Sequence, residues 1–256
     1  MLDLLRAEID ACDTILTETL TRRLMAAARI AAYKKEQSLA LYQPEREAVI
    51  LNKIAENLES TPYAKHIQDF YRCIFRLSRG IQMREVFPHN LVLIGFMGSG
   101  KTTVGQYLAD LSGYTYYDVD TIIEQQAGKS VSEIFSRYGE AAFRALERQT
   151  IESVSNNENA VISCGGGCIL DQNNIIDLKQ KGKLVWLMAE AETLYERIKY
   201  QGTRPLVLNK TFEEIKELVE KRRPLYSGAA DYQVAVDRKP VSDIVDVIIG
   251  MVMRQA

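Results

Sequence analysis

The residues with the clearest chemical potential are those at 95–102, which read GFMGSGKT. An apolar run at 91–94 precedes them, and a run at 103–111 that is compatible with a helix follows. Strand, glycine-rich loop and helix in this order place backbone N–H groups and a helix N-terminus around a polyphosphate. Lys101 would reach the outer phosphates, and the Thr102 hydroxyl would bind a magnesium ion held between them. The sequence therefore predicts a phosphate-binding P-loop.

Two carboxylates and three glycines follow later expected strands. Asp118 and Asp120 come at the end of a strand expected at 114–119, and their i, i+2 spacing predicts that both lie on one face of it. One could support the magnesium site while the other accepts a hydrogen bond from a substrate hydroxyl. Residues 165–167 are all glycine and follow the apolar run 160–164, so a ligand could approach the backbone there.

Three arginines stand near glycines, prolines or expected loop boundaries. Arg144 belongs to an FRALE segment, Arg204 to TRPL and Arg222 to RRPLY. Arginine binds carboxylates and phosphates through two parallel hydrogen bonds, which lysine cannot do. We expect these arginines to form a substrate clamp and a mobile lid.

The elements that must position these residues are those of an α/β domain. Strands are expected at 91–94, 114–119, 160–164, 184–188 and 232–236, and the clearest helices between them at 132–155 and 212–222. Strands that alternate with helices predict a parallel sheet covered by helices. The junction that precedes this domain is short, at 88–90.

The first 87 residues have a different pattern. Apolar residues spaced by three and four predict one long amphipathic helix that reaches at least residue 30, and two further helices are expected at 44–58 and 62–86. Arg23 and Lys34 continue the apolar stripe of the long helix, about 16 Å apart along it. Basic groups on a packing face need anionic partners, so a small dianion could lie between them. Arg6 is about 25 Å from Arg23 and would reach the same ligand only from the partner chain of an antiparallel dimer.

This N-terminal segment resembles the all-helical type of chorismate mutase. The resemblance covers essentially all of residues 1–86 and implies an all-α module that forms an intertwined homodimer. By resemblance Arg23 and the partner's Arg6 would hold the carboxylates of chorismate, and Lys34 and Gln82 would face its ether oxygen. The implied site comprises Arg6, Arg23, Lys34, Gln43, Arg46, Glu47, Ser78 and Gln82. Gln43 is a departure, because many members carry Asp there. A pericyclic rearrangement needs a clamp and donors aimed at the developing charge, and such a set supplies them.

The remainder, over nearly all of residues 91–250, resembles shikimate kinase. The P-loop, the Asp118–Asp120 pair, the segment at 139–144, the three glycines and the arginine motifs carry the resemblance. It implies domains at 1–87 and 88–256, ATP as co-substrate and Mg²⁺ as cofactor. Asp120, Lys101 and Arg204 would be catalytic, and Thr102 and Asp118 would form the metal site. ATP would contact Gly98, Ser99, Gly100, Lys101, Thr102, Thr103, Arg204 and Arg238, and shikimate would contact Asp120, Arg144, Gly165, Gly166, Gly167 and Arg222.

Composition narrows the protein class further. A net charge of -2 argues against a nucleic-acid binder, and the N-terminus shows neither a signal peptide nor a membrane span. The four cysteines and two histidines form neither a disulfide framework nor a zinc pattern. We expect a cytoplasmic protein with buried or neutral thiols.

Two alternatives remain at this point. The α/β domain could be a P-loop kinase for another small polyol, such as gluconate. The helical segment could be a non-catalytic module that dimerises the kinase or senses chorismate or prephenate.

Overall fold

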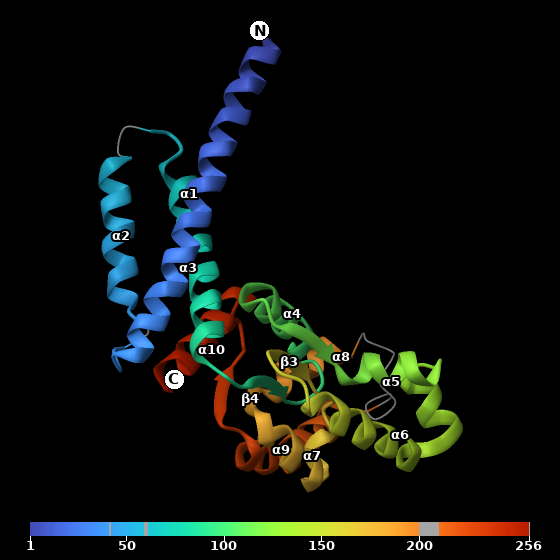
Figure 1. Ribbon diagram of the computed structural model, residues 1–256. Coiled ribbons are helices and arrows are strands. Elements are labelled where there is room, and N and C mark those ends of the chain that lie inside the picture. The colour runs from blue at the N-terminus through green and yellow to red at the C-terminus, as the bar shows by residue number, and fades with distance from the viewer. Residues whose placement is uncertain (41, 59–60, 200–209, 256) are drawn as a thin grey trace. The chain divides into compact units, whose positions relative to one another are not determined.

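The computed structural model describes residues 1–40, 42–58, 61–199 and 210–255 (Figure 1). The chain divides into two compact units. The first is Met1–Phe87 with the residues from Val252 onward, and the second is Pro88–Met251. No helix in the described part of the chain is both long and apolar enough to cross a membrane.

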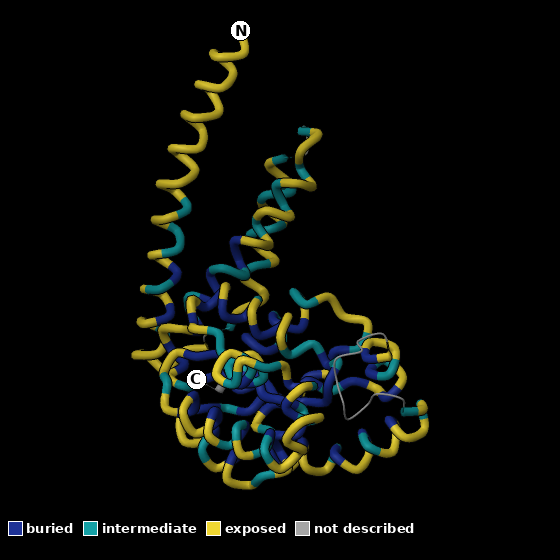
Figure 2. The backbone as a smooth tube through the Cα atoms, turned by 90° about the vertical axis from the view of Figure 1, so that its right-hand side faces the viewer, coloured by how far each residue is buried: buried dark blue, intermediate teal, exposed yellow. Residues whose placement is uncertain are grey.

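The first unit is helical, with α1 (Leu2–Glu36), α2 (Pro44–Asn57) and α3 (Ala64–Val86). Pro44 starts α2 at a first-turn position, where its missing N–H costs no helical hydrogen bond. The buried residues of α1 are Ala27 and Ala31, which are small enough to let α3 pack closely against this end of the helix. The N-terminal half of α1 carries no buried residue in the single chain (Figure 2).

The second unit is built on a five-stranded parallel sheet in the order β2-β3-β1-β4-β5 among the described residues. The strands are β1 (Asn90–Ile94), β2 (Thr115–Asp118), β3 (Ala160–Ser163), β4 (Gly182–Met188) and β5 (Tyr232–Ala235). All residues of β1 are buried, as expected for a central strand covered on both faces. The predicted fold class, an all-α module followed by an α/β domain with a parallel sheet, is confirmed.

Helices connect the strands of this sheet. They are α4 (Lys101–Ser112), α5 (Val119–Ala127), α6 (Val131–Ser155), the 3₁₀ turn η1 (Cys168–Leu170), α7 (Gln172–Lys181), α8 (Ala191–Ile198), α9 (Phe212–Ala229) and α10 (Val241–Gln255). Capping boxes start α6 and α9, where Ser130 pairs with Glu133 and Thr211 with Glu214. Gly139 interrupts α6 with a φ of 80°, so the chain kinks between two helical segments.

Two expectations from the sequence were wrong in detail. Asp118 ends β2 and caps α5, whereas Asp120 lies in the first turn of α5, so the two carboxylates do not share a strand face. The helix expected to end at Arg222 continues through Pro224 to Ala229, because the buried Tyr226 anchors the turn beyond the proline. Of the cysteines, Cys164 and Cys168 are buried, and Cys12 and Cys73 are exposed in the single chain.

Candidate active site

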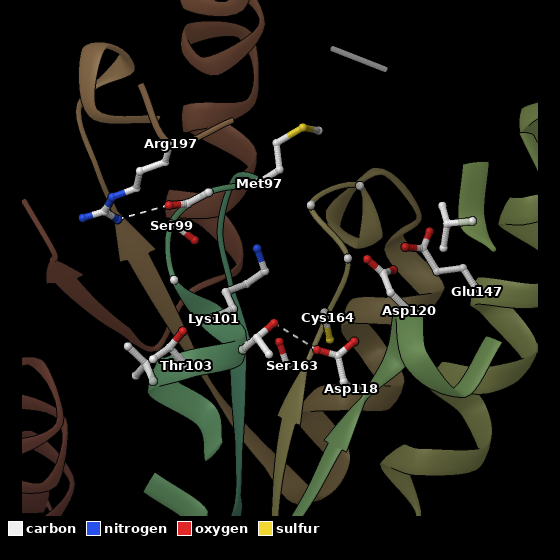
Figure 3. Close-up of a pocket in the computed structure, with 18 of the residues that line it drawn as sticks. Met97, Ser99, Lys101, Thr103, Asp118, Asp120, Glu147, Ser163, Cys164 and Arg197 are labelled. Atoms are coloured by element: carbon white, nitrogen blue, oxygen red, sulfur yellow. Dashed lines mark hydrogen bonds between the residues drawn. The ribbon is translucent and has the colours of Figure 1, made fainter. Parts of the chain in front are cut away.

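A cavity of about 460 Å³ lies at the carboxyl ends of β1, β2 and β3 (Figure 3). Because these strands are parallel and adjacent, the segments that follow them meet at one edge of the sheet. The P-loop follows β1, the Asp118–Asp120 pair follows β2, and the glycines at 165–167 follow β3. The topology therefore brings together three motifs that are far apart in sequence.

The P-loop forms one wall of this cavity. Gly98 and Gly100 have φ angles of 79° and 89°, which a residue with a side chain rarely adopts, and Gly100 caps α4. Lys101 Nζ donates hydrogen bonds to the carbonyls of Gly95 at 3.0 Å and Phe96 at 3.1 Å. The loop thus presents an ammonium group and the N-terminus of a twelve-residue helix to the cavity, which is an arrangement suited to a polyphosphate.

Hydroxyl and carboxylate oxygens meet beside the P-loop. Thr102 Oγ1 donates to Asp118 Oδ2 at 3.1 Å, drawn as a dashed line in Figure 3. The backbone N–H of Thr121 donates to Asp118 Oδ1 at 3.2 Å, because Asp118 is the N-cap of α5. Magnesium at a nucleotide site uses one or two protein oxygens together with phosphates and water, so Thr102 and Asp118 fit this ion. The described residues contain no group of three or more His, Cys, Asp or Glu side chains that would hold a metal by themselves.

Acidic and basic groups line the other end of the cavity. Arg144 Nη1 donates to Glu147 Oε2 at 2.6 Å, and Arg144 Nη2 donates to Glu140 Oε1 at 2.9 Å. Glu147 is only 1% exposed, and burial raises the pKa of its carboxyl while Arg144 opposes that shift. A Cβ placed on Gly165 would lie 2.8 Å from Glu147 Oε1 and 2.9 Å from Asp120 Oδ1. Both carboxylates therefore converge on the glycine loop.

Arg222 reaches the same loop from α9. It is buried, and its Nη1 donates to the carbonyl of Gly166 at 3.2 Å. Tyr226, one turn further along α9, donates to the same carbonyl at 2.5 Å and stacks on Trp186. These bonds fix both the arginine and the glycine loop, so the guanidinium groups of Arg222 and Arg144 line one cavity.

The sequence selected most of these residues but not all. Every predicted kinase residue among those described lines the cavity except Arg238, whose neighbour Lys239 lines it instead. Arg204 lies outside the described residues. Sequence reasoning gave no role to Glu147 or Arg197, whose Nη1 donates to the P-loop carbonyl of Gly98 at 3.1 Å. Spacing could have indicated Glu147, which lies three residues after Arg144 on one helix.

The helical unit collects most of the other predicted site residues on α1, α2 and α3. Arg23 Nη1 donates to Ser78 Oγ at 2.6 Å, and its guanidinium lies over the ring of Phe75. Lys34 Nζ donates to Gln43 Oε1 at 2.9 Å, so the amide at position 43 supplies an oxygen to this lysine.

The remaining predicted residues of the helical unit are Gln82, Glu47, Arg46 and Arg6. Gln82 Nε2 lies 3.4 Å from the carbonyl of Ala27. Glu47 forms an ion pair with Arg79 at 2.8 Å. Arg79 is buried, and the sequence did not indicate it. Arg46 is exposed at the start of α2, and Arg6 is exposed near the N-terminus, beside Asp3.

Comparison with known proteins gives matches to both units. Residues 97–253 match the family model for shikimate kinase, and residues 5–83 match the model for chorismate mutase type II. Shikimate kinase of Persephonella marina is 42% identical over 163 residues, which are 64% of this chain and 98% of that protein. Shikimate kinase of Sulfurihydrogenibium sp. is 40% identical over 166 residues, which are 65% and 99% of the two chains.

Solved structures show the same relation. Shikimate kinase from Acinetobacter baumannii in complex with shikimate is similar at a TM-score of 0.63 and 32% identity, over 65% of this chain and 94% of that one. The enzyme from Aquifex aeolicus is similar at a TM-score of 0.57 and 38% identity, over 63% and 95%. Both family resemblances inferred from the sequence are thereby confirmed.

Proposed function

The chain belongs to the shikimate kinase family, and we propose that residues 88–256 transfer the γ-phosphoryl group of ATP to the 3-hydroxyl of shikimate. One observation carries the proposal. The P-loop shares a single cavity with Asp120, two arginines and the glycine loop, so a polyphosphate and a small hydroxylated acid can meet there.

The nucleotide end of the cavity would bind and orient the phosphates. The P-loop N–H groups would bind the phosphate oxygens. Lys101 donates to the carbonyls of Gly95 and Phe96 here, and it would donate to the β- and γ-phosphates instead when ATP binds. Magnesium, when bound at Thr102 and Asp118, would offset the charge of the phosphate oxygens. We also assign Arg204 to the transferring phosphoryl group, on the sequence motif alone.

The opposite end would bind the acceptor. Arg144 and Arg222 would bind its carboxylate, and Asp120 with Gly166 and Gly167 would bind its hydroxyls. Asp120 would orient the attacking hydroxyl and accept its proton. Glu147 would fix Arg144 through their 2.6 Å ion pair.

The test compares Asp120→Asn with wild type at saturating ATP. We expect turnover of shikimate to fall at least about 100-fold in the variant, while ADP affinity stays unchanged. Asp110→Asn, an exposed aspartate on α4 outside the cavity, is the matched control. Phosphorylation of gluconate but not shikimate by the wild-type protein would overturn the proposal.

For residues 1–87 we propose a second activity, the rearrangement of chorismate to prephenate. The proposal is supported by contacts among residues of α1, α3 and the start of α2. Arg23 donates to Ser78, Lys34 donates to Gln43, and Gln82 lies near the carbonyl of Ala27. Arg6 is at the other end of α1, so we propose that it serves the site of a partner chain in a homodimer. The exposed apolar residues of the N-terminal half of α1, Leu2, Leu5, Ile9 and Leu16 among them, support this dimer.

Chorismate disappearance tests this activity. Arg46→Ala should lower turnover of chorismate, whereas Arg84→Ala, an exposed arginine near the end of α3, should not. Binding of chorismate without turnover by the wild-type protein would identify the helical unit as a sensor instead. Sedimentation velocity would show whether the chain is a dimer.

A further inference from the structure

We propose that Tyr116 is a positioning residue that holds Asp118, the carboxylate of the proposed magnesium site, in its working orientation. The inference rests on the proposed function, because that function assigns Asp118 to the ion. It concerns a residue on β2 that does not line the cavity and that no sequence motif indicated.

The contacts of the Tyr116 hydroxyl carry this inference. The hydroxyl donates to Asp118 Oδ2 at 3.1 Å, the same oxygen that accepts from Thr102 Oγ1 at 3.1 Å. Residues 116 and 118 are two apart on one strand, and Ser163 lies opposite Asp118 in the register of β2 and β3. The Tyr116 hydroxyl on β2 and the Thr102 hydroxyl at the start of α4 thus share one oxygen of the carboxylate.

These bonds leave the carboxylate little rotational freedom. Asp118 Oδ1 is held by the N–H of Thr121 as a helix cap, and Oδ2 is held by two hydroxyls. When Thr102 turns a lone pair toward a metal ion, its proton must still go to an acceptor, and Asp118 Oδ2 is in place for it. A second donor from Tyr116 keeps Oδ2 there while Thr102 changes its partners.

The position of the ring depends on Gly105, in α4. A Cβ on Gly105 would lie 2.6 Å from Tyr116 Cε2 and 3.2 Å from Leu93 Cδ1, too close for either atom to remain in place. The absence of a side chain at 105 therefore lets the ring lie against α4, one turn after Thr102. This packing explains a glycine inside a helix, where glycine is less favourable than alanine.

The test measures nucleotide binding rather than turnover. Calorimetry would give the Kd of ADP with excess Mg²⁺ and with EDTA for wild type, Tyr116→Phe and Tyr117→Phe. Tyr116→Phe keeps the ring and removes the hydroxyl, and Tyr117→Phe is the same change at the next residue of β2, outside the cavity. We expect Mg²⁺ to strengthen ADP binding to wild type, and this gain to shrink roughly three- to tenfold in Tyr116→Phe only. The Kd in EDTA and the Kd of shikimate should stay unchanged.

A second variant tests the role of Gly105. Gly105→Ala should reduce the Mg²⁺ gain as Tyr116→Phe does, and should have a smaller effect in a Tyr116→Leu background, where the clashing ring is gone. The inference would be overturned if Mg²⁺ strengthened ADP binding equally in Tyr116→Phe and wild type. It would also be overturned if Tyr116→Phe lost as much ADP affinity in EDTA as it loses with Mg²⁺. If wild type itself gains nothing from Mg²⁺, the proposed metal site fails instead of the role of Tyr116.

Discussion

Gly167→Ala should impair shikimate binding through Arg144. A Cβ on Gly167 would lie 2.6 Å from Arg144 Cζ, so the methyl group and the guanidinium cannot occupy their present positions together. The φ of Gly167 is -105°, which alanine adopts without strain, so the effect is steric and local. Arg144 would have to move by about 1 Å, to restore ordinary van der Waals contact.

The magnitude follows from what fixes Arg144. Its ion pair with the buried Glu147 at 2.6 Å resists the shift, so the methyl group would strain this pair or move the guanidinium from the position proposed for carboxylate binding. Loss of one charged hydrogen bond is worth about 1.5–3 kcal/mol, or roughly a 10- to 150-fold rise in the Kd of shikimate. ADP binding should not change, because neither Gly167 nor Arg144 belongs to the P-loop.

Calorimetry with shikimate and with ADP would measure both effects. Gly228→Ala is the matched control, since a Cβ there meets no atom within 4 Å and the residue lies in α9. We expect that control to bind both ligands normally and to be slightly more stable. Normal shikimate affinity in a folded Gly167→Ala protein would refute the assignment of Arg144 to the substrate carboxylate.

Three further predictions address other groups. Burial raises the pKa of Glu147, so the folded state binds the proton of this carboxyl more tightly than the unfolded state does. The stability of wild type relative to Glu147→Gln should therefore fall as pH rises above about 4.5. Thermal melts from pH 4 to 8 would measure this fall. Gln43→Asp would place a carboxylate about 3 Å from Lys34 Nζ, and burial lowers the pKa of this lysine. We expect chorismate turnover to rise several-fold. A decrease would show that the amide is required. Thr102→Val should abolish most of the Mg²⁺-dependent gain in ADP affinity while leaving shikimate affinity intact, and unchanged Mg²⁺ dependence would remove Thr102 from the metal site.

The cationic groups of α1 show where sequence and structure complement each other. The spacing of Arg6, Arg23 and Lys34 predicted that Arg6 could not serve the site of its own chain, and it lies near the far end of the helix from both. The structure adds that Arg23 is held by Ser78 and Phe75 and that Glu47 is held by Arg79. Those partners lie 30 or more residues away along the chain, so helical spacing could not identify them.

The sequence by itself determined the P-loop, the helical module, the alternation of strands and helices and most of the cavity residues. These features depend on local rules, such as glycine conformations and apolar periodicity, that act over a few residues. Asp120 shows where such rules fail, because the same two carboxylates can follow a strand or start a helix, and only the cap made by Asp118 decided it. The strand order β2-β3-β1-β4-β5 gathered the three motifs at one edge, and it arises from packing among segments distant along the chain. Only tertiary structure could show that Arg222 contacts the carbonyl of Gly166 and that Tyr116 shares an oxygen of Asp118 with Thr102, because these contacts depend on atoms that spacing does not encode.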